Sequence, residues 1–280
     1  MSTPVLLAGA AAADITPAMG MQLAGDIGRP RPVEVIKDRL AVHALVLECG
    51  EQKACLLSLD LLASTEPWAS RLRQAVGELV GCSMEAVMLH VTQTHSAPSL
   101  GHCFWRPQYC EPFRETMDWL SGGDEAYNPL VMQATLDAVR RALARRRPVT
   151  MSKASVVDGR VAFNRRCKLR DGTARMGRPG AQEAPLLQVE GPADPEVGVA
   201  LLTGTDGVHE AALLHHTCHP THGYPTREVS ADWPGTWRRA LQAELGSAIP
   251  LVINGCCGNV GPNNLLDPNH RANQDRMGEL

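Results

Sequence analysis

Apolar residues follow two different periods along the first half of the chain, and they predict alternating strands and helices. Two apolar runs, 39–48 and 53–62, flank a short polar turn, which is typical of paired strands. Positions 66–80 repeat apolar residues at helical spacing, and 86–95 is an apolar strand that ends in polar residues. The segment 124–146 again has a helical period. These elements are typical of an α/β protein.

The second half of the chain repeats this layout. Strands are expected at 197–204 and 208–221, a helix at 233–245 and another strand at 249–256. The order of two strands, a polar loop, a helix and a strand therefore occurs twice, without a repeat of individual residues. Both halves place polar clusters at the carboxyl ends of strands, where α/β folds have their binding sites.

Composition bounds the class of protein. The chain has 280 residues, 44% hydrophobic and 20% charged, which indicates a globular protein with a large core and allows one large domain over 1–280 or two small ones. Its net charge of −3 gives no basic excess for nucleic acid, and no apolar run reaches the roughly 18 residues of a membrane span. Nine cysteines, several of them inside apolar runs, favour a reducing cytoplasm.

The first polar cluster is TQTHSAPS, at 92–99. Because side chains alternate along a strand, we expect Gln93 and His95 to share one face at the mouth of the sheet. A neutral imidazole at that place can bind a metal. A histidine that is hydrogen-bonded to a loop carbonyl is the alternative interpretation.

The second cluster, HHTCHPTHG at 215–223, contains four histidines and Cys218. His215 and His219 are expected on one face of the strand, which Pro220 ends directly after His219. We expect at least one of these histidines to bind a metal. The spacing is not that of a zinc finger, and no HExxH motif is present.

Two further segments suggest supporting roles. Asp232 precedes a helix, where it would cap the first turn, and it could also orient the imidazole of His219. Asn254 and Gly255 open the glycine-rich loop 254–264, whose N–H groups could stabilise an oxyanion. A tight turn with close backbone packing explains the same glycines without a function.

Taken together, these segments resemble the neutral/alkaline non-lysosomal ceramidase family, particularly its shorter bacterial members. The similarity covers nearly the whole chain in order: AAADITPAMGMQLAG, KDRLAVHALVL, LLSLDLL, TQTHSAPS, FNRRCKLRDGT, GPADPEVGVALL, HHTCHPT, SADWPG and NGCCGNVGPN. The resemblance implies one large α/β domain with two mixed β-sheets flanked by helices. It also implies a zinc-bound water that cleaves the amide of an N-acyl-sphingosine.

Residue by residue, the resemblance implies an altered site. His219 matches a zinc histidine in the family's HP motif, whereas the zinc histidine of the family's THTHSGP loop falls at Gln93. His95 matches the second histidine of that loop, beside the metal. A serine that assists the reaction falls at Gly261, and two further ligands, a glutamate and a tyrosine, come from a region beyond Leu280.

Zinc needs four ligands, or three and a water, and a glutamine carbonyl is a poor substitute for imidazole. An alternative set would therefore join His222 or Asp60 to His95 and His219. Asp60 ends an apolar strand, where a buried turn-capping role explains it equally well.

Three functions follow from this sequence. The first is a zinc-dependent hydrolase that cleaves an amide bond of a small-molecule or lipid-like substrate, for which a molecule smaller than ceramide is at least as plausible. Its metal residues are His219, His95 and Gln93, and its catalytic residues are His95, Asp232, Asn254 and Gly255. The loop 99–123 would form a substrate wall. The second is a non-catalytic scaffold or binding protein of the same fold. The third is a fragment of a longer hydrolase, or a chain that associates with another copy.

Overall fold

An eight-stranded sheet forms the centre of the computed structural model, which describes residues 4–26, 28–103, 119, 122–267 and 269–279. Its first four strands in space are β5 (Val87–Val91), β4 (Gln52–Leu59), β3 (Ala41–Cys49) and β1 (Leu6–Asp14). The other four are β6 (Arg147–Val157), β11 (Glu196–Gly204), β12 (His209–His216) and β14 (Ile249–Asn254). β1 and β6 join the two blocks through two residue pairs at one edge.

The two blocks have the same topology, which confirms the repeated layout predicted from the sequence. In each block an antiparallel hairpin is followed by a helix and by a strand that lies parallel to the second hairpin strand: β3, β4 and β5 in the first, β11, β12 and β14 in the second. Each block is therefore a mixed sheet, as expected. The sequence did not predict that the two sheets are joined: β1 of the first block pairs with β6 of the second, so that all eight strands form one continuous sheet.

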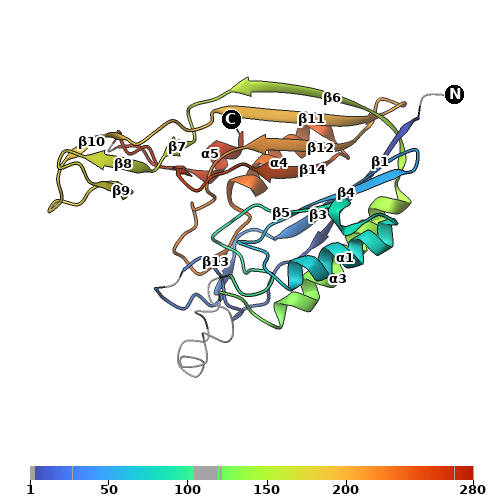
Figure 1. Cartoon of the computed structure of the whole chain (residues 1–280), viewed down its shortest axis with the longest axis horizontal. Helices are drawn as coiled ribbons and strands as arrows, with labels where there is room; N and C mark the ends of the chain where they lie inside the picture. Colours follow the sequence, from blue (N-terminus) through green and yellow to red (C-terminus); the bar gives the residue numbers. More distant parts are fainter. Residues whose placement is uncertain (1–3, 27, 104–118, 120–121, 268, 280) are drawn as a thin grey trace.

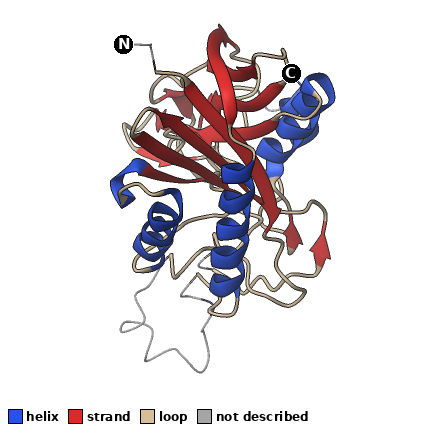
Figure 2. Cartoon of the chain, turned by 90° about the vertical axis from the view of Figure 1, so that its right-hand side faces the viewer, coloured by secondary structure: helices blue, strands red, loops and turns tan. Residues whose placement is uncertain are grey.

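Three apolar clusters bind the layers together. One fills the space between the two blocks and includes Ala10, Leu45 and Leu251. A second packs α1 (Trp68–Val80) and α3 (Tyr127–Ala144) on the outer face of the first block. A third includes residues of α4 (Asp232–Leu245) and α5 (Gln274–Glu279) beside the second block. The strands thus lie between two groups of helices (Figures 1 and 2).

The helices form where the periodic pattern predicted them. α1 buries Leu72, Val76 and Val80, which recur every fourth residue, and it ends at Gly81 in the left-handed conformation that glycine favours. α3 lies within the predicted 124–146 segment and packs against β1 and β3. The helix expected at 233–245 is α4, which starts one residue earlier.

Close contact between α3 and β1 depends on Gly9. A Cβ at this position would lie 2.1 Å from the carbonyl oxygen of Ala142 and 2.7 Å from the amide nitrogen of Arg146, both backbone atoms of the α3 end. We expect Gly9→Ala to lower the free energy of unfolding by about 3 kcal/mol, because the helix must move off the strand. Urea denaturation would measure this loss.

Gly159 provides the matched control, since a Cβ there would meet nothing within 4 Å and its backbone needs no positive φ. Gly159→Ala should change the free energy of unfolding by less than about 0.5 kcal/mol. Equal stabilities of the two variants would show that α3 does not rest on the β1 backbone at Gly9.

Short strands and one short helix lie outside the eight-stranded sheet. β2 (Val35–Ile36) pairs with β13 (Glu228–Val229), β7 (Phe163–Asn164) pairs with β15 (Val260–Gly261), and η1 (Met84–Ala86) precedes β5. β8 (Arg166–Leu169), β9 (Ala174–Met176) and β10 (Leu186–Val189) form a small sheet at the left of Figure 1. The β7–β15 pair matters for the site because it links Arg165, just after β7, to the loop after β14. Most of the loop expected at 99–123, including the aromatic residues Phe104, Trp105 and Tyr109, lies outside the described residues.

Candidate active site

The strand predicted at 86–95 is shorter than expected, which changes how its polar end is placed. β5 ends at Val91, and Gln93 adopts a positive φ of 66° that breaks the alternation of side chains. The expectation that Gln93 and His95 share a strand face is therefore wrong. His95 is positioned by its own backbone, since its N–H donates to the carbonyl of Pro220 at 3.0 Å.

His95 and His219 converge although 124 positions separate them, as their places after two strands predicted. Their Nε2 atoms are 2.8 Å apart. Each Nδ1 faces a backbone carbonyl: Gly25 at 3.2 Å for His95, and Cys257 at 3.1 Å for His219. Gly25 has a positive φ of 91°, and a Cβ there would lie 2.7 Å from Nδ1 of His95, so only glycine allows this approach.

These contacts orient the two rings of the pair. A carbonyl oxygen only accepts, so each Nδ1 is placed to donate to its carbonyl, and the two Nε2 atoms meet at hydrogen-bond distance. Burial lowers the pKa of His95 to about 4, with His219 and the cations of Arg31 and Arg165 acting in the same direction. Burial and Arg165 also lower the pKa of His219. Burial therefore favours the neutral form of both rings, and two imidazole nitrogens that could serve as donors to a cation lie at one point.

Gln93 lies beside this pair. Its Oε1 accepts a hydrogen bond from Sγ of Cys257 at 2.9 Å, and the carbonyl of that same cysteine holds His219. Within the described residues no group of three or more histidine, cysteine, aspartate or glutamate side chains assembles into a metal site. The ionisable donors at this point are thus two imidazoles.

Asp232 orients a different histidine from the one expected. Its carboxylate, which is fully buried, accepts from Nδ1 of His222 at 2.6 Å and from the His222 amide at 2.8 Å. It also accepts from the Trp233 amide at 2.7 Å, near the start of α4. His219 is instead held by the Cys257 carbonyl, so Asp232 positions the loop after β12 rather than the His219 ring.

Asn254 and Gly255 use their donors inside the fold, whereas we expected N–H groups available to an oxyanion. The Asn254 side chain donates to the Thr92 carbonyl at 3.0 Å and accepts from the Cys218 amide at 3.2 Å. The Gly255 N–H donates to the His216 carbonyl at 3.1 Å. Both residues therefore fasten the end of β14 to the ends of β5 and β12.

Asp60 is not placed as a metal ligand. Its side chain is fully buried, and its Oδ2 accepts from Nη2 of Arg238 at 2.6 Å and from the Ala41 amide at 3.1 Å. Arg238 lies on α4, so this ion pair links the first block to a helix of the second. The turn-capping interpretation of Asp60 agrees with these contacts.

Sequence reasoning missed Arg31, which fixes the backbone around the pair. Its side chain is fully buried and donates to the carbonyls of His95 at 2.8 Å, Ala24 at 3.1 Å and Thr226 at 2.6 Å. It comes from an irregular segment with no periodic pattern, so nothing in the sequence marked it. Arg31 joins the loop before β2, the loop after β5 and the loop after β12 into one unit.

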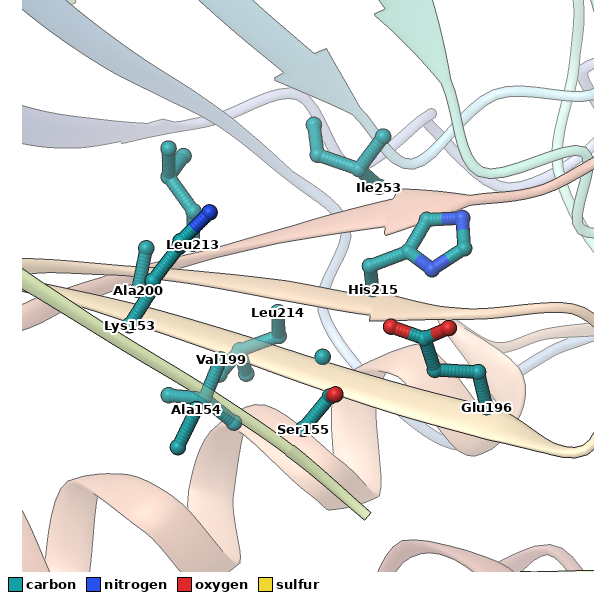
Figure 3. A pocket seen from close by; sticks show the side chains of 11 residues that line it. Lys153, Ala154, Ser155, Glu196, Val199, Ala200, Leu213, Leu214, His215 and Ile253 are labelled. Carbon is teal, nitrogen blue, oxygen red and sulfur yellow. The ribbon is translucent and has the colours of Figure 1, made fainter. Parts of the chain in front are cut away.

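A separate cavity of about 440 Å³ opens on the face of β6, β11 and β12. In Figure 3 the carboxylate of Glu196 lies beside the His215 ring, with Ser155 and Lys153 on the neighbouring strand. Gly198 pairs in register with both Ser155 and His215, and its missing side chain leaves the space between them. This face carries a positive side chain, Lys153, and a negative one, Glu196. Neither His95 nor His219 lines the cavity.

Comparison with known proteins shows that the chain has a ceramidase-like mixed α/β fold. No family model and no curated protein matches the sequence. Among solved structures, the chain is similar to the neutral ceramidase from Pseudomonas aeruginosa, with a TM-score of 0.75 and 19% identity. It is also similar to a ceramidase complexed with C2, with a TM-score of 0.74 and 18% identity.

These alignments cover 99% of this chain but only 43% and 42% of the two ceramidase chains. The chain therefore spans less than half the length of the ceramidases that it resembles, and the likeness shows the fold alone. In addition, none of the helices in the described ranges is long and apolar enough to span a membrane.

Proposed function

We propose that this chain is a hydrolase that cleaves an amide (C–N) bond, with the His95–His219 pair at its reactive centre and a zinc-like ion as its cofactor. The observation that carries the proposal is the convergence of two Nε2 atoms at 2.8 Å, each ring being oriented by a carbonyl at its Nδ1. Carbonyl acceptors behind ligand imidazoles are the usual way in which proteins orient metal ligands. The ceramidase-like fold supports hydrolysis as the class of reaction.

The lowered pKa of His95 favours a role as metal ligand over a role as general base. A general base works best when its pKa lies near the operating pH, and a pKa of about 4 makes His95 a weak proton acceptor at neutral pH. The same low pKa keeps the imidazole neutral, which is the form that binds a metal. The pair therefore suits metal binding without a competing proton.

The residues present fit two positions of a metal site. His95 and His219 would hold the ion, with Gln93 beside them, and the remaining ligands would come from outside the described residues. A bound ion would activate water and polarise the amide carbonyl of a small-molecule or lipid-like substrate. Arg31 and the Cys257 carbonyl keep the two rings aimed at one point, so little reorganisation is needed when substrate binds.

The test combines metal content with amide hydrolysis. The purified parent should contain near-stoichiometric metal and release amine from N-acyl substrates of increasing chain length, and a chelator should abolish that release. His219→Ala should lose both metal and hydrolysis. His209→Ala, which removes an imidazole at the far end of β12, should lose neither. Hydrolysis that persists in His219→Ala would contradict the proposal.

A second candidate is a binding or scaffold protein that keeps this fold without catalysis. Gln93 in place of an imidazole, and the absence of a third ionisable donor in the described part of the chain, favour it. Purified protein that contains no metal, takes up none on titration and hydrolyses none of the amides would establish this alternative.

A further inference from the structure

A cavity of about 420 Å³ is lined by Arg165 after β7, by Thr221 after β12, by Gly261 of β15 and by the loop after β15. Arg165, Arg178, Thr221 and Asn264 are among the residues that line it, and they come from separate segments of the chain. This volume is in the range of small-molecule sites, roughly 300–1,000 Å³. The cavity can therefore hold part of a substrate rather than a single ion.

The cavity is cationic although the whole chain is acidic. Three arginines line it, Arg165, Arg178 and Arg271, against one carboxylate, that of Asp267. The chain as a whole has a net charge of −3. A local excess of guanidinium groups in a concave surface raises the concentration of anions there.

Arg165 and Arg178 are held by carbonyl groups rather than by carboxylates. Nε and Nη2 of Arg165 donate to the Gly258 carbonyl at 3.1 and 2.9 Å, and Nη2 of Arg178 lies 3.4 Å from the Asn264 carbonyl. Neither forms an ion pair within the described residues. Nearby arginines of the same region do pair with carboxylates: Arg160 with Asp158, Arg166 with Glu190, and Arg175 with Glu183. The charges of Arg165 and Arg178 are thus not neutralised by a carboxylate of the described residues.

The cavity reaches the reactive pair through two residues. Arg165 donates to the Gly258 carbonyl, next in the chain to Cys257, whose carbonyl faces Nδ1 of His219. Oγ1 of Thr221, which also lines the cavity, donates to the His219 carbonyl at 3.4 Å. Gly261 also lines the cavity, and it leaves space beside the Arg165 side chain, whose Cδ would lie 3.4 Å from a Cβ at this position.

We infer that this cavity is an anion subsite, and that the substrates are acyl amides carrying a carboxylate or a phosphate. That the bound compounds are substrates rests on the proposed amide hydrolysis. Anion binding in the cavity does not depend on that proposal. Guanidinium groups bind carboxylate and phosphate oxygens through paired N–H donors, which would hold the anionic end while the amide lies at the His95–His219 pair.

Binding to the full chain tests the subsite directly. Isothermal titration would compare two anionic compounds, N-acetylglycine and phosphorylated N-acetylethanolamine, with their neutral counterparts N-acetylglycinamide and N-acetylethanolamine. At least one anionic compound should bind at least about tenfold more tightly than its counterpart, and added salt should weaken that binding. Equal affinities within both pairs would overturn the inference.

Two arginine variants separate the cavity from general surface charge. Arg178→Gln should weaken anion binding at least about tenfold, and its exposed position makes a folding defect unexpected. Arg170→Gln, an exposed arginine just after β8 that does not line the cavity, should leave the affinity unchanged. Equal losses in the two variants would contradict a specific subsite.

The outcomes also distinguish this inference from the proposed function. Anion binding without hydrolysis of any amide would support the subsite and reject the hydrolase. Hydrolysis of neutral amides without preference for anionic ones, together with no anion binding, would reject the subsite and leave the hydrolase in place. Binding of N-acetylglycine that persists in His219→Ala would show that the subsite does not need the reactive pair.

Discussion

The free energy of unfolding should fall steeply as the pH is lowered from 6.5 towards 4.5. Five described histidines have pKa values below the usual 6.5, and burial is the first cause for each: His43, His90, His95, His216 and His219. In the unfolded chain these imidazoles regain their ordinary pKa. Below pH 6.5 the unfolded state therefore binds more protons than the folded state, and acid favours unfolding.

The magnitude is large because the five groups act together. Each extra proton changes stability by about 1.4 kcal/mol per pH unit, so five give a slope approaching about 7 kcal/mol per pH unit. Domains are typically stable by roughly 5–15 kcal/mol. We therefore expect metal-free protein to lose stability as the pH falls below 6.5, most steeply where all five imidazoles are still neutral in the folded state and already charged in the unfolded chain. Urea denaturation at half-unit steps of pH, in the presence of a chelator, would measure the slope.

His43 offers a control that avoids the candidate metal residues. It lies on β3, is 7% exposed, and its Nδ1 has no hydrogen-bond partner among the described residues. His43→Gln removes one titrating group, so the slope should fall by about one proton whatever happens to the stability at neutral pH. A slope of less than one proton in the parent would contradict these pKa directions.

The sequence predicted those parts of the fold that a local pattern determines. α1 and α3 have apolar positions at helical spacing, and the hairpins show paired apolar runs around polar turns. The convergence of His95 and His219 was also predictable, because both follow strands of an α/β fold and such strands end at a common edge.

The rest of the site depends on backbone geometry that residue types do not encode. The positive φ of Gln93 ends the strand early, and no rule of alternation signals it. Asp232 had a satisfactory local explanation as a helix cap, yet its carboxylate is used by His222, ten positions away. Arg31 and Arg165 reach the site from irregular segments, whose positions only the tertiary structure defines.

Replacement of Gln93 by histidine should raise zinc affinity by at least about 100-fold. The Gln93 side chain reaches Cys257, whose carbonyl orients His219, so an imidazole at 93 would add a third nitrogen beside the pair. Histidine also tolerates a positive φ better than most residues, which makes the substitution compatible with the local backbone. Competition with a chromophoric chelator would measure the affinity of both proteins.

The control is Gln93→Asn, which keeps an amide side chain and tolerates the same backbone but supplies no imidazole. Its zinc affinity should not exceed that of the parent. A second readout comes from linkage: at a fixed zinc concentration above the dissociation constants, a 100-fold gain in affinity adds about 2.7 kcal/mol to the free energy of unfolding. Equal affinity of Gln93→His and the parent would show that position 93 does not face the ion.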